Sequence, residues 1–192
     1  MQRLYKASCS DDNHAHRKFL RQIMVSMDIL APRYWWTEFD TYKVGTVSNS
    51  CSTMHKIHAK EFTLDDFSHE HLIGDFEPIP RQDAKDAWKF FIDPSACPLP
   101  IKSDTLLLLT REALNFYRKR FIETNDRLYW WQLIQLLPQS YNQLRTVTFN
   151  YEVAVAMIKQ RTNHRLDEWN EFVQILRDLP YLSLIMGESP NS

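Results

Sequence analysis

Glycine is scarce in this chain. Its 192 residues include only three glycines, at Gly45, Gly74 and Gly187. Phosphate loops of the P-loop or dinucleotide-binding kind need several glycines close together, because backbone amides must approach the phosphate. The sequence therefore excludes such loops, and any bound phosphate group has to be held by side chains and helix termini.

Cysteines and long apolar runs are also scarce. The three cysteines, Cys9, Cys51 and Cys97, are an odd number at unrelated spacings, which suits a reducing compartment without disulfides. No run of about eighteen apolar residues occurs, and the first residues lack the apolar core of a signal peptide. We therefore expect a cytoplasmic protein without a membrane-spanning segment.

Positive and negative charges nearly balance. The formal net charge is -1 and the sequence pI is about 6.7, so there is no general electrostatic case for a nucleic-acid or anionic-membrane partner. Aromatic residues make up 13% of the chain, which indicates a well-packed globular protein. The length favours one domain, expected over residues 1–186, followed by a flexible tail over 187–192.

Hydrophobic periodicity predicts mostly helices. They are expected before Pro32, from Pro32 to about Lys43, and over residues 64–72, 82–92, 106–122, 127–136 and 166–179. The run 106–109 is apolar on all sides, which predicts deep burial or a subunit contact. Residues 44–52 are β-branched and hydroxyl-rich and predict a loop or short strand. The proline-rich residues 93–104 predict a surface crossing within one domain.

Residues 137–161 carry several polar side chains that a core helix does not need. Pro138 ends one helix, residues 141–145 indicate a polar turn, and another helix is expected from about Thr148. On this helix Asn150 and Arg161 share roughly one face, and Arg145 enters from the turn. These groups predict a binding site for an anion or a planar, carbonyl-rich ligand. The alternative is structural, with Asn150 as a helix cap and Arg161 solvated at the helix end.

A second segment, residues 41–55, reads TYKVGTVSNSCSTMH. Together the two segments resemble the flavin-dependent thymidylate synthases, the thymidylate-synthase-complementing family. That family carries Arg-His-Arg at a helix end, a loop Ser-x-Asn-x-x-Ser-x-Arg-Tyr, and later Leu-Pro, a Tyr and Arg turn, Thr-x-Asn and a further Arg. The matching residues are Leu137, Pro138, Thr148, Asn150 and Arg161 without a gap, Tyr141 and Arg145 one place off, and Asn49 and Ser52 with one inserted residue.

Departures from the family pattern fall in residues 41–55. Thr41 and Tyr42 stand where the family has its first Arg and its His, and only Lys43 keeps the charge of its position. The other replacements are Ser50 for an acidic residue, Met54 for an Arg and His55 for a Tyr. A charge-assisted hydrogen bond is worth about 1.5 to 3 kcal/mol. The loss of two Arg donors would therefore weaken ligand binding by several orders of magnitude unless other residues compensate.

The resemblance implies a fold, an assembly and a reaction. The fold is α+β, a helix-rich single domain with a small antiparallel sheet, and family members form homotetramers with active sites between subunits. In the family, bound FAD is reduced by NADPH, takes a methylene group from methylenetetrahydrofolate, and delivers the carbon and reducing equivalents to dUMP. The implied cofactor is FAD, and the implied partners are a small-molecule nucleotide and further copies of the chain.

Site residues follow from the same resemblance, position by position. Arg161 would polarise the uracil ring and is the catalytic candidate. The nucleotide-binding candidates are Ser52, Arg145, Lys43 and Ser50, and the flavin-binding candidates are Asn150, Asn49, Tyr42 and Lys43. Lys43 would face either the flavin or the nucleotide phosphate.

Two classes of function remain open. The first is a flavin-linked enzyme acting on a uracil nucleotide, either a thymidylate synthase or a relative that modifies the same carbon with another partner. The second is a non-catalytic descendant that keeps the homo-oligomeric scaffold and nucleotide binding. A helical interaction module of unrelated ancestry is a third possibility, and it would lack a sheet between its long helices.

Other constellations point less well to a site. The histidine pairs are His14 with His16, His55 with His58, and His69 with His71. Pairs at i,i+2 cannot share a helix face, and the i,i+3 pair lacks a matching carboxylate, so no metal is expected. Cys51 lacks an assignable histidine partner and fits a small buried residue better than a nucleophile. The tryptophan pairs at 35–36 and 130–131 have the spacing of core or interface anchors, although either could stack on a base.

Overall fold

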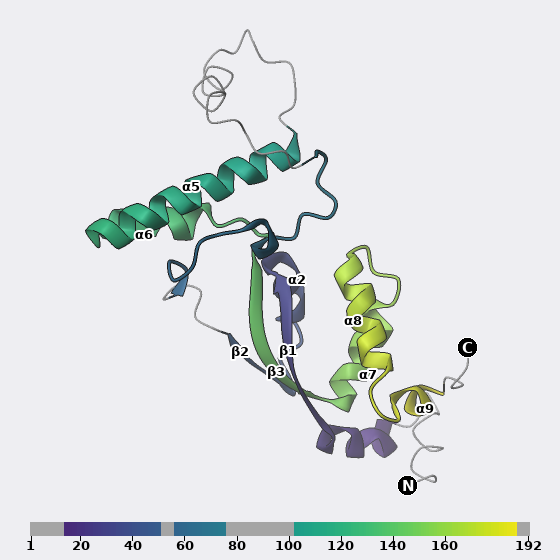
Figure 1. The fold of residues 1–192 in the computed structure, drawn as a ribbon. Coiled ribbons are helices and arrows are strands. Elements are labelled where there is room, and N and C mark those ends of the chain that lie inside the picture. The colour runs from purple at the N-terminus through teal and green to yellow at the C-terminus, as the bar shows by residue number, and fades with distance from the viewer. Residues whose placement is uncertain (1–13, 51–55, 76–101, 188–192) are drawn as a thin grey trace. The chain divides into compact units, whose positions relative to one another are not determined.

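The computed structural model describes residues 14–50, 56–75 and 102–187 (Figure 1). Its internal contacts divide the chain into two compact units. One unit comprises Met1–Cys51 and Gln143–Ser192, and the other comprises Ser52–Asn142. The single domain expected over residues 1–186 stays a prediction. Except for Gly187, the expected tail lies outside the described residues.

A three-stranded sheet and several helices form the first unit. In chain order they are η1 (His14–Gln22), β1 (Met24–Pro32), α2 (Arg33–Phe39), β2 (Thr46–Ser50), β3 (Asn142–Asn150), α7 (Tyr151–Arg161), α8 (Asp167–Arg177) and α9 (Leu182–Met186). The strand order is β1-β3-β2, so β3 is central. These elements confirm a helix-rich α+β fold with a small sheet, and they exclude a purely helical module.

Both strand pairs of this sheet are antiparallel. Between β2 and β3, Thr46 lies opposite Phe149 and Ser50 lies opposite Arg145. Between β1 and β3, the hydroxyls of Ser26 and Thr148 share a 2.8 Å hydrogen bond. Two residues further along β1, Asp28 accepts a 2.5 Å hydrogen bond from Thr146, two residues earlier in β3. The residue numbers of the paired positions rise along β1 while they fall along β3, so these two strands are antiparallel.

The expected helix before Pro32 is wrong beyond Gln22, because β1 begins at Met24. Along β1, Val25, Met27 and Ile29 are half-buried, and the residues between them are exposed. This period of two fits a strand with one covered face. Ile23 and Met27 also stand four residues apart, and this coincidence gave the segment its helical appearance.

Helix α2 follows the prediction made from Pro32. Pro32 is its N-cap residue, with φ of -68°, a value suited to a helix start. Trp35, Trp36 and Phe39 are buried, as expected for the inward face. The helix ends at Phe39, so the expected end at Lys43 is wrong. The tryptophan pair at 35–36 is therefore a core anchor. The predicted strand after α2 is confirmed for residues 46–50.

The expected polar turn at 141–145 and the helix from Thr148 are wrong in position. Strand β3 extends to Asn150, and α7 begins only at Tyr151. Val147 and Phe149 are fully buried, whereas Thr146 is exposed and Thr148 half-buried, so the segment alternates as a strand. The Asn150 side chain accepts a 3.1 Å hydrogen bond from the Val153 amide, which confirms the helix-cap alternative.

Replacing Asn150 with alanine is expected to lower the free energy of unfolding by about 1 kcal/mol, because the cap acceptor is lost. Urea denaturation followed by circular dichroism measures this change. The control is Asn150→Asp, which keeps an oxygen acceptor and places a negative charge at a helix start. Equal losses in both variants would mean that the amide nitrogen, and not the cap, stabilises this position.

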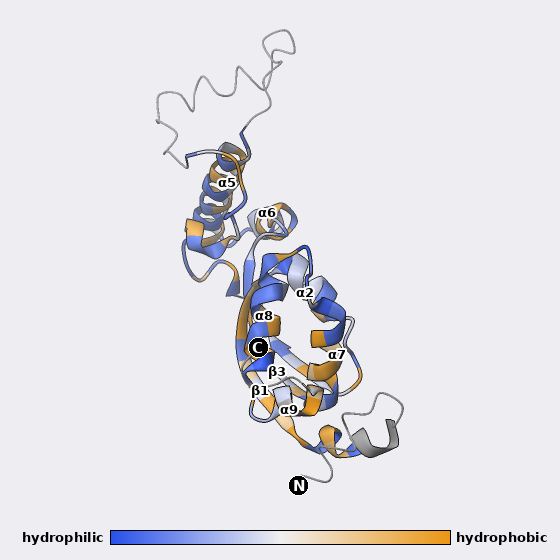
Figure 2. Ribbon diagram, turned by 90° about the vertical axis from the view of Figure 1, so that its right-hand side faces the viewer, coloured by the Kyte–Doolittle hydropathy of each residue, from blue (hydrophilic) through white to orange (hydrophobic). Residues whose placement is uncertain are grey.

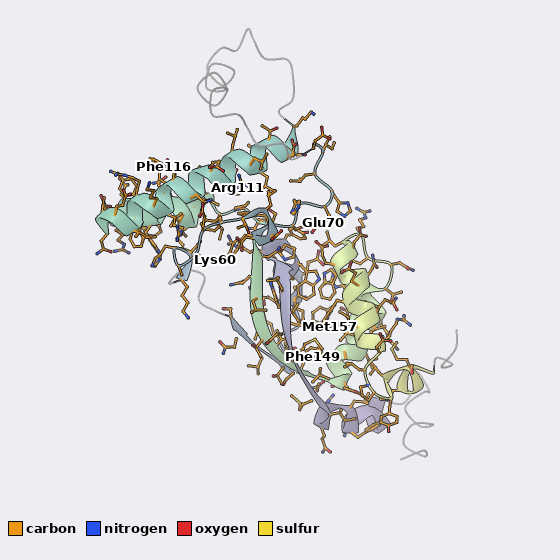
Figure 3. The ribbon with its side chains drawn as sticks, viewed as in Figure 1. Lys60, Glu70, Arg111, Phe116, Phe149 and Met157 are labelled. Carbon is orange, nitrogen blue, oxygen red and sulfur yellow. The ribbon has the colours of Figure 1, made fainter. Side chains whose placement is uncertain are left out.

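One hydrophobic core joins the sheet to the helices of the first unit. On α8, Trp169, Phe172, Val173 and Leu176 form a buried stripe at helical spacing. Figure 3 labels Phe149 of β3 and Met157 of α7, two fully buried members of this core. Helices α2, α7 and α8 cover the sheet face that carries Val147 and Phe149 (Figure 1). Residues on the other face, such as Thr146, are exposed.

The second unit contains a short 3-10 helix and a helical hairpin. Its elements are η2 (Leu64–Asp66), α5 (Ser103–Thr124) and α6 (Arg127–Leu136). The predicted capping box of Thr63 and Asp66 is confirmed, but the helix expected over 64–72 ends at Asp66. Helix α6 has the predicted bounds. Between α5 and α6, Asn125 has a positive φ of 52°, and the side chain of Asp126 caps α6 by accepting from the Leu128 amide.

The run 106–109 predicted deep burial or a subunit contact, and the structure shows that α5 is not buried on all sides. Leu107 and Leu108 are buried, but Leu106 is 54% exposed. Further along the helix, Phe116, labelled in Figure 3, is 58% exposed. Hydrophobic and hydrophilic residues alternate along α5 in Figure 2. A subunit contact at this helix stays a prediction.

Several expectations fall outside the described residues. The helix over 82–92 does so entirely, and most of the proline-rich segment does too. The expected last helix is confirmed as α8, and α9 follows it after Pro180. Among the helices of the described ranges, none is long and apolar enough to cross a membrane.

Candidate functional site

Two carboxylates at the end of α2 bind two arginines that come from distant parts of the first unit. Glu38 lies in the last turn of α2, and Asp40 is its C-cap residue. Glu38 accepts a 2.6 Å ionic hydrogen bond from Arg161, and Asp40 accepts one of 2.9 Å from Arg145. The structure therefore brings the two candidate arginines to the same end of one short helix.

Arg161 is enclosed by aromatic and polar groups. It is the last residue of α7, and its side chain is 17% exposed. Nε donates to the Tyr42 hydroxyl at 2.9 Å, and that hydroxyl donates to Gln160 at 2.9 Å. The guanidinium carbon lies 4.7 Å from the ring centre of Trp169, a cation–π distance. This environment holds Arg161 in one orientation and contradicts the alternative of a solvated surface arginine.

His164 completes this cluster. Its Nε2 lies 3.3 Å from the Glu38 carboxylate and 3.2 Å from Nη1 of Arg161. Its Nδ1 accepts a hydrogen bond from the Leu166 amide at 3.1 Å. An accepting Nδ1 places the proton of the neutral ring on Nε2, directed at the carboxylate. Glu38 therefore binds two donors, and both restrain it.

Arg145 has a similar environment. Its Nη1 donates to both oxygens of Asp40, at 2.9 and 3.2 Å, and its Nε donates to the Gln143 side chain at 3.0 Å. The guanidinium carbon lies 4.4 Å from the ring centre of Trp36. Ser50 is the cross-strand partner of Arg145, and such partners share a sheet face. Ser50 and Arg145 thus lie side by side.

Each of these arginines keeps one nitrogen for a ligand. Nε and Nη1 are engaged in both, while Nη2 makes no hydrogen bond to a residue in the described ranges. A guanidinium forks onto a phosphate through two neighbouring nitrogens. With only Nη2 left, and with the charge paired, each arginine is suited to a single hydrogen bond to a carbonyl oxygen.

Asn150 lies apart from both arginines. It caps the start of α7, whereas Arg161 ends the same helix, and a rise of 1.5 Å per residue separates them by roughly 16 Å. Along β3, Asn150 is likewise roughly 17 Å from Arg145 at about 3.4 Å per residue. One chain therefore does not bring Asn150 and the arginines around one ring, contrary to the expected convergence.

Gly45 lies directly against Asn150. Its φ is +79°, and a Cβ atom at this position would lie 2.7 Å from Nδ2 of Asn150. Glycine is required here both for the left-handed backbone and for the close approach. The amide oxygen of Asn150 is engaged by its cap bond, so Nδ2 is the atom that faces the turn before β2.

The remaining candidates are scattered. Lys43 is exposed. Asn49 lies opposite Thr146 and so faces away from Arg145. Asn49 and Ser50 border a shallow hollow of about 120 Å³. Ser52 lies outside the described residues, as do Cys51 and His55.

Sequence reasoning missed Glu38, Asp40, His164 and Trp169. Glu38 and Asp40 stand just before the altered motif at Thr41, and this proximity was the one available signal. Among the residues in the described ranges, no three His, Cys, Asp or Glu side chains come together as a metal site.

The fold is similar to that of known enzymes. One crystal structure of thymidylate synthase X (ThyX) from Helicobacter pylori, with FAD and dUMP, superposes with a TM-score of 0.60 at 15% identity, covering 96% of this chain and 79% of that one. Another, of flavin-dependent ThyX from Helicobacter pylori complexed with FAD and dUMP, gives a TM-score of 0.52 at 15% identity, covering 95% and 92%. The sequence matches no protein-family model and no curated protein. The likeness thus lies in the fold.

Proposed function

We propose that this protein binds FAD and a uracil nucleotide, dUMP, and transfers a one-carbon unit to the pyrimidine with altered efficiency. The observation that carries the proposal is the 2.9 Å hydrogen bond between Tyr42 and Arg161. Tyr42 stands at the family's His position in the first matching segment, and Arg161 stands at the last Arg of the second. The two segments that carry the resemblance therefore meet in space. The shared fold supports the same reading.

In this proposal the chain's own residues bind and orient the ligands. Nη2 of Arg161 donates to a uracil carbonyl and polarises the ring, while Tyr42 and Glu38 fix the guanidinium. Arg145, Ser50 and Ser52 hold the nucleotide, with Lys43 facing either the flavin or the nucleotide phosphate. FAD supplies the reducing chemistry, with NADPH and methylenetetrahydrofolate as co-substrates.

The flavin candidates Asn49, Tyr42 and Asn150 do not share one place in a single chain. The separation between Asn150 and Arg161 is explained if sites form between subunits, as in the homotetramers of the family. Asn150 from one protomer would then meet Arg161 from another. The homo-oligomer is therefore part of the proposal.

Flavin uptake tests the proposal most directly. The purified protein is titrated with FAD, and the flavin absorbance retained after gel filtration is measured, followed by dUMP-dependent NADPH oxidation with methylenetetrahydrofolate. We expect FAD to be retained, and Arg161→Ala to lower the dUMP-dependent rate by at least about 100-fold. The matched control is Arg165→Ala, at an exposed position four residues later, which should keep the rate. Protein that retains no FAD and binds no dUMP contradicts the proposal.

A second candidate is a non-catalytic scaffold, and a specific observation favours it. Glu38 and Asp40 neutralise both arginines from within the protein. A scaffold tolerates this pairing, whereas an enzyme needs those charges for its ligands. Light scattering that shows a stable homo-oligomer, together with nucleotide binding but no NADPH oxidation at any FAD concentration, would support the scaffold.

A further inference from the structure

The surroundings of Arg145 have the components of an anion site. The Arg145 side chain is only 17% exposed. It lies over the face of Trp36, and Gln143 fixes its Nε. Ser50 presents a hydroxyl group on the same sheet face. Restrained arginines beside hydroxyl groups are typical of oxyanion recognition.

The Asp40 carboxylate already occupies the anion site beside Arg145. Both carboxylate oxygens of Asp40 accept from Nη1 of Arg145, at 2.9 and 3.2 Å. A phosphate would need this same nitrogen to bind through two parallel hydrogen bonds, and it would need the same positive charge. The carboxylate and an incoming phosphate therefore compete for Arg145.

We infer that Asp40 is a specificity-determining residue, an internal anion that closes the Arg145 site to phosphate groups until its carboxylate is displaced. The inference deepens the proposed function and rests on it only for the identity of the ligand, a uracil nucleotide. Its consequence is selectivity. A ligand gains little from its phosphate in the wild-type protein, and its binding depends on ring carbonyls that Nη2 can reach.

Asp40 is better placed for displacement than Glu38. The Asp40 side chain is 51% exposed and lies at the C-cap of α2, where a rotation moves it into solvent. Glu38 is 35% exposed and is held by both Arg161 and His164. Exposed ion pairs contribute little net stability, so a phosphate can replace the Asp40 carboxylate without unfolding its surroundings.

Inorganic pyrophosphate provides a test that does not depend on nucleotide binding. Isothermal titration calorimetry at fixed salt compares wild type with Asp40→Asn. We expect Asp40→Asn to bind pyrophosphate at least about tenfold more tightly, because Arg145 regains an uncompensated charge. The matched control is Asp178→Asn, an exposed position at the end of α8, which removes the same charge elsewhere and should change the affinity less than about twofold.

Two further variants make the result specific. Adding Arg145→Gln to Asp40→Asn should abolish the gain, because the anion then lacks its guanidinium. If Asp40→Asn fails to fold, Asp40→Ser removes the same carboxylate and gives the same comparison. Equal or weaker pyrophosphate binding by the folded variant overturns the inference, and so does a gain that survives Arg145→Gln.

A comparison of dUMP with deoxyuridine separates this inference from the proposed function. In wild type the phosphate should add less than about threefold to the affinity, and in Asp40→Asn at least about tenfold. Nucleotide binding with a full phosphate contribution in wild type overturns the role of Asp40 and leaves the proposed function standing. Tighter pyrophosphate binding by Asp40→Asn, without binding of either uracil ligand, would support the role of Asp40 and contradict the proposed function.

Discussion

Replacing Trp169 with alanine is expected to remove about 3 to 5 kcal/mol from the free energy of unfolding. The side chain has 0% exposure, and its ring centre lies 4.7 Å from that of Trp35 and 5.9 Å from that of Phe172. Truncation leaves a large cavity between α2 and α8 that a packed core cannot close. The loss is a large part of the total stability of about 5 to 15 kcal/mol typical of a domain.

Chemical denaturation monitored by far-ultraviolet circular dichroism measures this loss. The matched control is Trp131→Ala on α6, where the side chain is 41% exposed. Its expected effect is roughly 1 kcal/mol or less, because a partly exposed ring buries less apolar area. Similar losses at both positions would contradict the placement of Trp169 at the centre of the core.

Substituting Gly45 by alanine is expected to destabilise the protein by about 2 to 4 kcal/mol. One part of this loss is backbone strain, because an alanine with φ of +79° occupies an unfavourable region. The other part is a steric clash, since the new Cβ would lie 2.7 Å from Nδ2 of Asn150. Relief of the clash requires movement of Asn150, which caps α7.

Gly187→Ala separates these two contributions. Gly187 has a similar φ of +75°, but a Cβ there meets nothing within 4 Å. Its loss should be about 1 kcal/mol, from strain alone. Thermal unfolding of both variants gives the difference due to the clash with Asn150. If the two variants lose the same stability, the close approach of Gly45 to Asn150 is not present in solution.

Elements with local signals were predictable from the sequence. Pro32 fixes the start of α2 through its own backbone geometry, and Trp35, Trp36 and Phe39 mark its inward face. Thr63 and Asp66 satisfy each other's donors, so the capping box is recognisable in four residues. Each of these features depends on neighbours in the sequence, and a single sequence records such neighbours completely.

The strands β1 and β3 were not predictable in the same way. They pair across more than a hundred residues, as the hydrogen bond between Ser26 and Thr148 illustrates. Short amphipathic segments with apolar residues at positions such as 23 and 27 fit a helix and a strand about equally, and tertiary pairing decides between them. The helix prediction was wrong because Val25, Met27 and Ile29 pack together on the covered face of the sheet, which requires a strand.

In the candidate site, too, some residues were predictable from the sequence and others were not. Similarity of motif drew attention to Arg161, Arg145 and Tyr42, and the structure places all three around the end of α2. Glu38 could not be identified beforehand, because its contact with Arg161, 123 residues later in the chain, depends on tertiary packing. His164 follows Arg161 by three residues, but its approach to Glu38 depends on the same packing. The pairing of the Glu38 carboxylate with the Arg161 charge is a property of the folded arrangement and has no signature in residue spacing.

The register of β2 and β3 has a consequence for the architecture of the chain. Ser50 and Arg145 are opposite each other, so the polypeptide leaves the sheet and returns to it at neighbouring positions. Everything from Ser52 to Asn142 is, in topological terms, an insertion at the tip of a hairpin. A tight turn of two to five residues could close that hairpin without shifting a single strand pair. The pairing of β2 with β3 therefore does not by itself limit the length of the segment between them.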